Sequence, residues 1–584
     1  MRPFVRPIAA SILFLAASAT HALTIRVGPA GDPACDENRL IDALGTTGSN
    51  PGLDTILVAN SPDQYPNTLG LIGGQDVVIE GGYSSCSATT PSGRTTLRGS
   101  DGGSVPPFVL ANSSGSNQVT LRNLDIIGGL GPVQRRGGAM SVSGSYVVTL
   151  DNTQIRDSRA GYGGGIYIRP GSTSSVILRG NSGISNNTAL VAGGGIFCSG
   201  TSLVALQRGG LFGNEAASGS TSELAGRGGG AALVDGCRLS QDGAPGFNQA
   251  FGNTAAEAGG AYYLRNASLF ITGTPTNAAM VMSNEARDGG AIAVEDDTDP
   301  GAGPASMVTI RNAWIEDNYA QWQGGAIAML RGGTLSMGRS LAGNHCHTPT
   351  LCSSLSFNGV PFGGDAATAR GGALYVGTGA RATVYSTLIE GNEGVVSSVL
   401  WQLGTGQARI DSSLLTDNLG TLLVGNNLRN SELVLSWSTV TRNRLASGNY
   451  LVSASNETGG RVKVFGSVLG EAITYGVYPL GAPLTADCVA RDPAMAALSG
   501  TASREFKLAA PYNVSSSGHI LDDTALPVDF CDQSLAPRVD GDLDGQTGIG
   551  DAPRPDSHGR HDLGADEVVY AAPDDRIFAD GFEA

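Results

Sequence analysis

The sequence predicts an all-β fold in the form of a three-sided parallel β-solenoid, chiefly because a short motif repeats along the chain. An aliphatic residue is followed three positions later by asparagine, and neighbouring sites are often 25 to 34 residues apart. A Gly-Gly pair that opens a short apolar run follows most of these sites. Internal repetition of this period decides the fold class. The motif asparagines are Asn187, Asn214, Asn284, Asn318, Asn344, Asn392, Asn418 and Asn443.

The length of the repeat limits what one unit can be. It is too short for a propeller blade, and the segments lack the apolar stripe of paired helices. Three strands of roughly five residues with their turns use about 25 to 30 residues, which is one coil of a solenoid. The 86 glycines and the 15% of charged residues agree with a fold of strands and tight turns.

Alternation within the repeat predicts which side chains face inward. Val148, Leu150 and Ile155 share one face of their strands, and Asn152 falls at the corner between them. Asparagine and serine can bond the local backbone there, and asparagine tolerates a left-handed backbone. The glycine pairs suit the next corner, where positive φ and close neighbours exclude a side chain. We also expect asparagines of stacked coils to form a hydrogen-bonded ladder.

The N-terminus is typical of a secretory signal peptide over residues 1–22. Arg2 and Arg6 precede an apolar run from Ile8 to Ala17, and small residues lead to cleavage after Ala22. A membrane anchor is the alternative, but the run is too short to span a bilayer. No later segment is long and apolar enough either, so we expect an exported chain without a transmembrane segment.

The remaining chain divides into four predicted regions. Residues 23–110 form an N-terminal cap and the first coils, in which residues 36–44 place Leu40, Ile41 and Leu44 at helical spacing. Strands are expected at 54–58 and 77–79. The coils occupy 111–470, a less regular C-terminal cap occupies 471–568, and 569–584 is an acidic tail that serves either as a sorting tag or as a disordered end.

Eight cysteines in an exported chain predict disulfides. Contacts in a solenoid run only to adjacent coils, which favours pairing of nearest neighbours. Cys346 and Cys352 would then staple an inserted loop. A metal site built from His345, Cys346, His347 and Cys352 is the alternative at that loop. The predicted pairs are Cys35–Cys86, Cys198–Cys237, Cys346–Cys352 and Cys488–Cys531.

These motifs resemble those of a known group. The aliphatic-x-x-Asn sites, together with Gly164-Gly165-Ile166 and Gly289-Gly290-Ala291-Ile292, resemble the repeats of polymorphic outer membrane proteins. The layout over residues 24–568 is similar to that of bacterial secreted right-handed parallel β-helix proteins with a pectin-lyase-like fold. The resemblance implies a right-handed helix and a secreted or outer-membrane-associated location in a Gram-negative bacterium. The residues after the coils show no series of alternating strands like those of an autotransporter barrel.

Many proteins of this fold cleave polysaccharides, so a catalytic site is one hypothesis. A lyase of the pectate type needs carboxylates that hold calcium and a nearby basic residue. The candidates are Arg287, Asp288, Glu295 and Asp296, which flank one predicted strand. The segment from Asp296 to Pro300 also suits a solvated loop. A glycoside hydrolase would need paired carboxylates on successive coils.

The other hypothesis is a non-catalytic binding or adhesive protein. Trp314 and Trp322 could stack on sugar rings, or they could simply pack in turns. The net charge of 36 minus 52, or −16, excludes nucleic acid and anionic lipid as partners. We therefore expect an exported protein that binds a polysaccharide or a cell-surface glycan, with polysaccharide lyase or glycoside hydrolase as the alternative.

A calcium site is predicted near the C-terminus. Asp540, Asp542, Asp544 and Asp551 occupy positions 1, 3, 5 and 12 of a twelve-residue loop with Gly545 at position 6. This resembles an EF-hand loop, in which alternating oxygen ligands surround one Ca²⁺ ion. Position 12 is Asp rather than the longer Glu, and no flanking helices are evident. A solvated acidic turn is the alternative.

Overall fold

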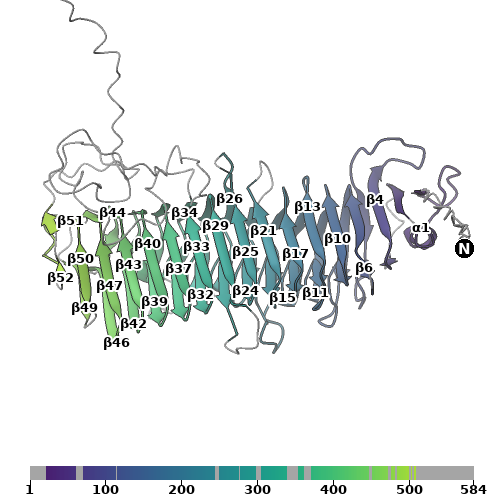
Figure 1. Ribbon diagram of the computed structural model, residues 1–584. Coiled ribbons are helices and arrows are strands. Elements are labelled where there is room, and N and C mark those ends of the chain that lie inside the picture. Colours follow the sequence, from purple (N-terminus) through teal and green to yellow (C-terminus); the bar gives the residue numbers. More distant parts are fainter. Residues whose placement is uncertain are drawn as a thin grey trace, which may run out of the picture.

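The computed structural model describes residues 22–507 except 51, 61–69, 114, 244–248, 275, 298–303, 339–352, 361–369, 446–449, 471–474, 481–482, 499–500 and 503–504. Figure 1 shows these residues as one elongated column of stacked coils, with the N-terminal elements at one end. The strands pair in parallel within two sheets of 17 and 36 strands. The predicted all-β parallel β-helix is confirmed.

A regular coil contains four short strands, one more than the repeat length suggested. In one coil, β13 (Ser175–Arg179) belongs to the smaller sheet, whereas β14 (Gly183–Ser185), β15 (Thr188–Ala192) and β16 (Ile196–Ser199) belong to the larger one. The extra strand arises because Asn186 and Asn187 form a corner of only two residues between β14 and β15. We call the strands that stack with β14, β15 and β16 the first, second and third rows.

The smaller sheet forms one face of the column, with one strand from each coil. Its strands are β1 (Thr24–Val27), β2 (Leu53–Ala59), β4 (Asp76–Tyr83), β7 (Asn117–Arg122), β10 (Tyr146–Asp151), β13, β17 (Leu203–Leu206), β21 (Arg238–Asp242), β25 (Ser268–Thr272), β29 (Met307–Arg311), β33 (Thr334–Gly338), β37 (Arg381–Tyr385), β40 (Gln407–Asp411), β43 (Glu432–Ser436), β47 (Arg461–Phe465), β50 (Leu484–Asp487) and β52 (Thr501–Ala502).

The first row of the larger sheet follows the smaller sheet in each coil. It contains β5 (Thr95–Arg98), β8 (Leu124–Leu130), β14, β18 (Gly210–Phe212), β22 (Gln249–Phe251), β26 (Ala279–Met282), β30 (Ala313–Glu316), β34 (Ser353–Ser356), β38 (Thr387–Glu390), β41 (Leu414–Thr416), β44 (Thr439–Thr441), β48 (Val468–Gly470), β51 (Val489–Arg491) and β53 (Glu505–Lys507).

The second and third rows complete each coil, and four long strands span two rows. The second row contains β15, β19 (Glu215–Ala216), β23 (Thr254–Ala255), β27 (Glu285–Asp288), β31 (Tyr319–Gln323), β35 (Gly359–Val360) and β45 (Arg444–Leu445). The third row contains β3 (Gly70–Ile72), β6 (Phe108–Ala111), β9 (Met140–Ser143), β12 (Ile166–Ile168), β16, β20 (Ala231–Val234), β24 (Tyr262–Arg265), β28 (Ile292–Glu295), β32 (Ile327–Arg331), β36 (Leu374–Thr378), β46 (Tyr450–Thr458) and β49 (Tyr475–Leu480). The long strands are β8 and β11 (Gln154–Tyr162) in the first and second rows, and β39 (Glu393–Gly404) and β42 (Leu419–Arg429) in the second and third.

The predicted alternation of inward and outward residues is confirmed. Val148 and Leu150 of β10 and Ile155 of β11 are completely buried, whereas Thr149, Asp151 and Gln154, which alternate with them, are partly exposed. Their equivalents form a single apolar core that runs from Ile25 to Leu498. Parallel pairing begins before residue 111 and continues past residue 470, as far as β53.

Buried asparagines connect the coils through their side chains. The Nδ2 group of each asparagine donates to Oδ1 of the asparagine in the next coil, at distances of 2.8 to 3.1 Å. Each backbone N–H, from Asn187 to Asn418, donates to the same Oδ1 atom. This asparagine ladder confirms the expected one. Its members are Asn187, Asn214, Asn253, Asn284, Asn318, Asn358, Asn392, Asn418 and Asn443.

Two members of the ladder, Asn253 and Asn358, were not among the predicted sites. Asn253 has only Ala250 at the apolar position, whereas Asn358 matches the motif through Leu355. Asn358 receives the side-chain bond of Asn318 at 2.9 Å and therefore takes the position expected for Asn344, which lies outside the described residues. The coil that follows Asn318 is consequently longer than the motif spacing indicated.

The other corners also follow the prediction. Asn152, Asn312 and Ser386 adopt left-handed backbone angles, with φ of 49°, 47° and 43°. At the glycine corner, Gly289 has φ of 64°, and a Cβ atom on Gly290 would lie 2.3 Å from the carbonyl oxygen of Gly325 in the next coil. One glycine of this pair therefore provides the turn, and the other allows the coils to approach.

The N-terminal cap contains the only helix among the described residues. Helix α1 (Leu40–Thr47) begins later than predicted, and Ile41 is exposed whereas Ala43 and Thr47 are buried beside Leu40 and Leu44. The preceding residues adopt another structure because Glu37 pairs with β1 and Cys35 is bonded to Cys86. The expected strands at 54–58 and 77–79 lie within β2 and β4.

No helix in the described part of the chain is long and apolar enough to span a membrane.

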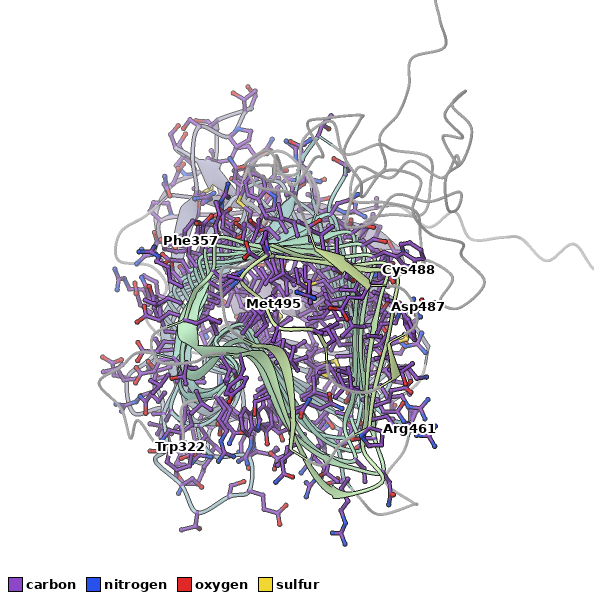
Figure 2. All side chains as sticks on the ribbon, turned by 90° about the vertical axis from the view of Figure 1, so that its left-hand side faces the viewer. Trp322, Phe357, Arg461, Asp487, Cys488 and Met495 are labelled. Carbon is purple, nitrogen blue, oxygen red and sulfur yellow. A yellow bond between two sulfur atoms is a disulfide. The ribbon has the colours of Figure 1, made fainter. Side chains whose placement is uncertain are left out.

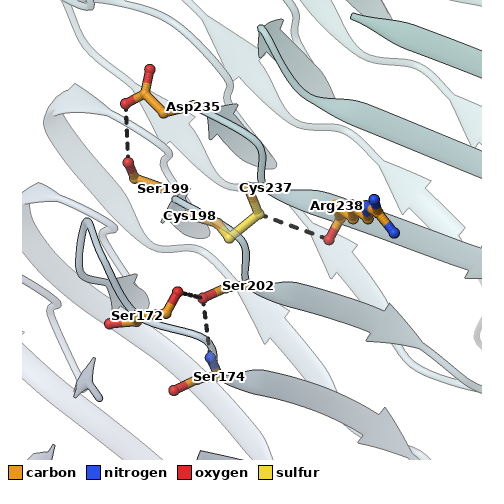
Figure 3. Close-up of a disulfide and its surroundings, with 8 residues drawn as sticks. All are labelled: Ser172, Ser174, Cys198, Ser199, Ser202, Asp235, Cys237 and Arg238. Atoms are coloured by element: carbon orange, nitrogen blue, oxygen red, sulfur yellow. Dashed lines mark hydrogen bonds between the residues drawn. A yellow bond between two sulfur atoms is a disulfide. The ribbon is translucent and has the colours of Figure 1, made fainter. Parts of the chain in front are cut away.

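Two predicted disulfides are present. Cys35 is bonded to Cys86, and Cys198 at the end of β16 is bonded to Cys237 just before β21, in the next coil (Figure 3). Cys488 is also disulfide-bonded. Its predicted partner Cys531, and the predicted pair Cys346 and Cys352, lie outside the described residues.

We predict that replacing one ladder asparagine destabilises the protein strongly. In the Asn284→Ala variant, Asn253 loses its acceptor and Asn318 loses a donor, and each unsatisfied buried group costs about 1–3 kcal/mol. Urea denaturation should show a fall of at least about 2 kcal/mol in the free energy of unfolding. Asn181→Ala, at an exposed turn, is the control. Equal stability of the two variants would contradict a structural role for the ladder.

Candidate functional site

The corner between the second and third rows carries outward side chains whose type varies along the column. These residues precede the positive-φ glycine in many coils and stack in register along the column. Viewed along the column in Figure 2, the ribbon turns inward on the side where Trp322 is labelled. We call this set the corner strip. In order, its residues are Arg136, Tyr162, Ala192, Arg227, Ala258, Asp288, Gln323 and Arg370.

A cavity of about 880 Å³ lies over the middle of the corner strip. This volume falls within the range of ligand pockets. One wall comes from the segment between β19 and β20, and the floor comes from β24, β28 and β32 of the third row. The charged and aromatic residues that line it are Glu223, Arg227, Glu257, Tyr263, Arg265, Glu295, Asp297 and Arg331.

Glu295 is the centre of a polar network in this cavity. Its Oε2 atom accepts hydrogen bonds from Arg227 at 3.0 and 3.2 Å and from the Tyr263 hydroxyl at 3.3 Å. Arg331 lies 3.8 Å from its other oxygen. Burial and the nearby Glu295 carboxylate raise the pKa of Tyr263, so the hydroxyl stays protonated and remains a donor.

A second network leads from the cavity to Trp322. Glu257, which lines the cavity, forms an ion pair with Arg287. The Arg287 guanidinium also donates to Asp288 Oδ2 at 3.1 Å and stacks on the Trp322 ring, 4.6 Å from its centre. Trp322 is 42% exposed, so part of its ring remains open to solvent.

Asp288 is an unusual carboxylate in this network. It is only 4% exposed, and its Oδ1 atom has no hydrogen-bond partner within the described part of the chain. Burial raises its pKa, Arg287 opposes that shift, and the neighbouring Glu257 and Glu295 reinforce it. A buried carboxyl group with a raised pKa beside a cavity is a typical feature of functional sites.

Paired arginine and aromatic side chains recur along the corner strip. Besides Arg287 and Trp322, Arg136 lies 4.1 Å from the Tyr162 ring centre and Arg370 lies 4.8 Å from that of Trp401. Such stacking of a guanidinium on a ring contributes about 0.5–1 kcal/mol at exposed sites and fixes both side chains. The strip therefore offers preorganised flat surfaces to a ligand.

The structure brings three of the predicted catalytic candidates together. Arg287, Asp288 and Glu295 lie at the cavity or beside it. Asp296 lies elsewhere, because its oxygens accept from the backbone N–H groups of Asn266 at 2.9 Å and Ser306 at 2.7 Å. Asp296 therefore fixes the backbone at the base of the loop that follows β28.

The two predicted sugar-binding tryptophans lie on different rows. Trp322 lies in β31 of the second row, at the site, whereas Trp314 lies in β30 of the first row, beside Met280 of the preceding coil. The predicted calcium ligands Asp540, Asp542, Asp544 and Asp551, and the alternative metal site around His345, lie outside the described residues.

Several site residues were not predicted from the sequence. Arg227 comes from one coil and Glu257 and Tyr263 from the next, and they meet only because the coils stack. The available signal was the position just before the glycine corner, which Arg227 and Asp288 share.

Comparison with known proteins adds nothing to this assignment. No protein-family model matches the chain, and no curated protein shows significant sequence similarity to it.

We predict that Asp288 reduces the stability of the folded protein at neutral pH. Because its folded-state pKa is raised, ionisation disfavours folding above that pKa, and the penalty disappears as the pH falls towards the ordinary aspartate value of 3.8. Relative to wild type, Asp288→Asn should therefore be more stable at pH 7 than at pH 4.5.

Urea denaturation of both proteins at the two pH values tests this expectation. Asp42→Asn, which changes an exposed carboxylate on α1, should show a smaller difference between the two pH values. A greater loss of stability for Asp288→Asn at pH 7 than at pH 4.5 would show that Asp288 instead acts as a stabilising ion-pair partner.

Proposed function

We propose that the protein is an exported β-helix that binds carbohydrate at the cavity and corner strip, with a binding or adhesive role at a bacterial surface. The partly exposed ring of Trp322, held from one side by Arg287, carries this proposal. Aromatic rings present a flat apolar face that suits the C–H face of a sugar, and the polar groups beside it suit its hydroxyl groups.

The shape of the site favours a linear polymer. The corner strip extends over eight coils, and coils repeat about every 4.8 Å, so it is roughly 34 Å long. The cavity occupies only its middle part. A chain of sugar units could therefore lie along the strip and place one unit in the cavity.

The charge of the site favours a neutral glycan. At the cavity, Arg227, Arg265 and Arg331 lie among a larger number of carboxylates, which are Glu223, Glu257, Glu295 and Asp297. Together with the net charge of −16, this excess of carboxylates opposes binding of an anionic polymer.

The resemblance of the repeats to those of polymorphic outer membrane proteins supports a location at the bacterial surface.

We predict that Trp322→Ala weakens glycan binding about tenfold or more, because the stacking surface is lost. A glycan array would identify the ligand, and isothermal titration calorimetry would measure its affinity. Trp314→Ala is the matched control, since Trp314 lies on another row. Equal loss in both variants, or no loss in either, would contradict the assignment of the site to Trp322.

A second candidate function is glycoside hydrolysis, and the state of Asp288 favours it. A carboxyl group whose pKa is raised can act as a general acid towards a glycosidic oxygen. Arg287 is a poor base for the lyase mechanism, because its guanidinium is engaged in ion pairs with Glu257 and Asp288.

If the protein is a hydrolase, wild type should release reducing ends from the glycans that it binds, and Asp288→Asn should lower that rate at least about a hundredfold. Glu223→Gln, which changes an almost fully exposed carboxylate at the cavity rim, is the control. Bound glycans that stay intact over long incubation would leave binding as the function.

A further inference from the structure

Three arginines line the cavity, and only the guanidinium of Arg265 donates no hydrogen bond to a described residue. Arg227 donates to Glu295 at 3.0 and 3.2 Å, and Arg331 donates to the carbonyl oxygen of Asp296 at 2.7 Å. The Arg265 side chain is 18% exposed, and Nε is the only nitrogen of its guanidinium that is fully buried without a partner. Its two terminal nitrogens are therefore open to a ligand in the cavity.

Three carboxylates surround this guanidinium without binding it closely. Nε lies 3.7 Å from Asp297, Nη1 lies 3.9 Å from Glu223, and Nη2 lies 4.0 Å from Asp235. These distances exceed the 2.7–3.2 Å or so of an N–H···O hydrogen bond. Glu223 comes from the cavity wall, Asp235 follows β20 of the preceding coil, and Asp297 follows β28 of the next coil.

The charges around Arg265 favour a neutral ligand group. A carboxylate or sulfate on the ligand would be repelled by the three carboxylates, and an ammonium group would be repelled by the guanidinium itself. The matching group must accept from N–H groups and also donate to carboxylate oxygens. A hydroxyl group does both.

The shape of the guanidinium favours two hydroxyl groups rather than one. Its terminal nitrogens present N–H groups side by side in a rigid plane, which matches two oxygen atoms that are also held side by side. Hydroxyl groups on adjacent ring carbons of a sugar hold their oxygens in this way. Glu223 and Asp297 line the same cavity, so they are placed to accept the two hydroxyl protons.

We propose that Arg265 recognises a pair of adjacent free hydroxyl groups on the sugar unit that occupies the cavity. Nη1 and Nη2 donate to the two hydroxyl oxygens, and the hydroxyl groups donate to Glu223 and Asp297. The ligand is then a linear neutral polymer whose internal units keep such a pair, as the units of cellulose do. In laminarin the linkage uses one hydroxyl of that pair, and the free hydroxyl groups of its internal units are not adjacent.

The inference rests on the proposed carbohydrate binding and can fail separately from it. Calorimetric titration with the hexasaccharides of cellulose and of laminarin provides the test, because both are neutral chains of glucose that differ in the position of their linkage. The cellulose hexasaccharide should bind at least about tenfold more tightly.

A variant tests the role of Arg265 itself. Arg265→Lys keeps a positive charge among the three carboxylates but removes the paired N–H groups. It should reduce the preference for the cellulose hexasaccharide to less than about threefold. Arg238→Lys, at an exposed position of β21 in the smaller sheet, is the matched control and should keep the full preference. Thermal unfolding of both variants shows whether they are folded.

The outcomes separate the two proposals. If the glycan array shows binding through Trp322 but the cellulose hexasaccharide binds no more tightly than that of laminarin, the assignment of Arg265 is wrong and carbohydrate binding stands. The same conclusion follows if Arg265→Lys keeps the preference, because the shape of the chain would then explain it. Tighter binding of the chitin hexasaccharide, in which an acetamido group replaces one hydroxyl of the pair, would also overturn the assignment. If no glycan binds, both proposals fail.

Discussion

Hydrogen bonds between asparagine side chains in successive coils set the register on which the rest of this protein depends. Each ladder asparagine satisfies the backbone N–H and the side chain of the preceding one, at buried positions where either group would otherwise be costly. A slip of one residue in any coil would break these bonds and turn its apolar side chains outward. The outward side chains of the corner strip are therefore aligned because the ladder holds their coils in place.

The fold could be predicted from the sequence because its determinants are local. Alternating apolar residues, glycine corners and left-handed asparagines each occupy a few consecutive positions. The ladder was predicted less completely. At Asn253 the preceding residue of the motif is Ala250, a weaker apolar signal, and regular spacing favoured Asn344 over Asn358. The spacing failed there because chain can be added between two strands without moving either of them.

The candidate site could be predicted only in part, because its chemistry depends on stacking. Arg287, Asp288 and Trp322 lie within or close to recognisable strands, and sequence analysis identified them. Arg227 bonds Glu295 across 68 residues, and the pairing of Gln323 with Arg370 joins positions that are 47 residues apart in the sequence. Local patterns show which positions point outward, but the register decides which of them meet.

The ladder also makes this architecture tolerant of added sequence. Its members are separated by as few as 25 residues, between Asn418 and Asn443, and by as many as 40, between Asn318 and Asn358, yet both bonds keep ordinary lengths. Each doubling of a flexible loop costs only about 0.6 kcal/mol of closure entropy. Evolution can therefore lengthen or exchange the segments around the corner strip almost independently of the scaffold, so related chains could acquire new ligands through insertions while their core stays unchanged.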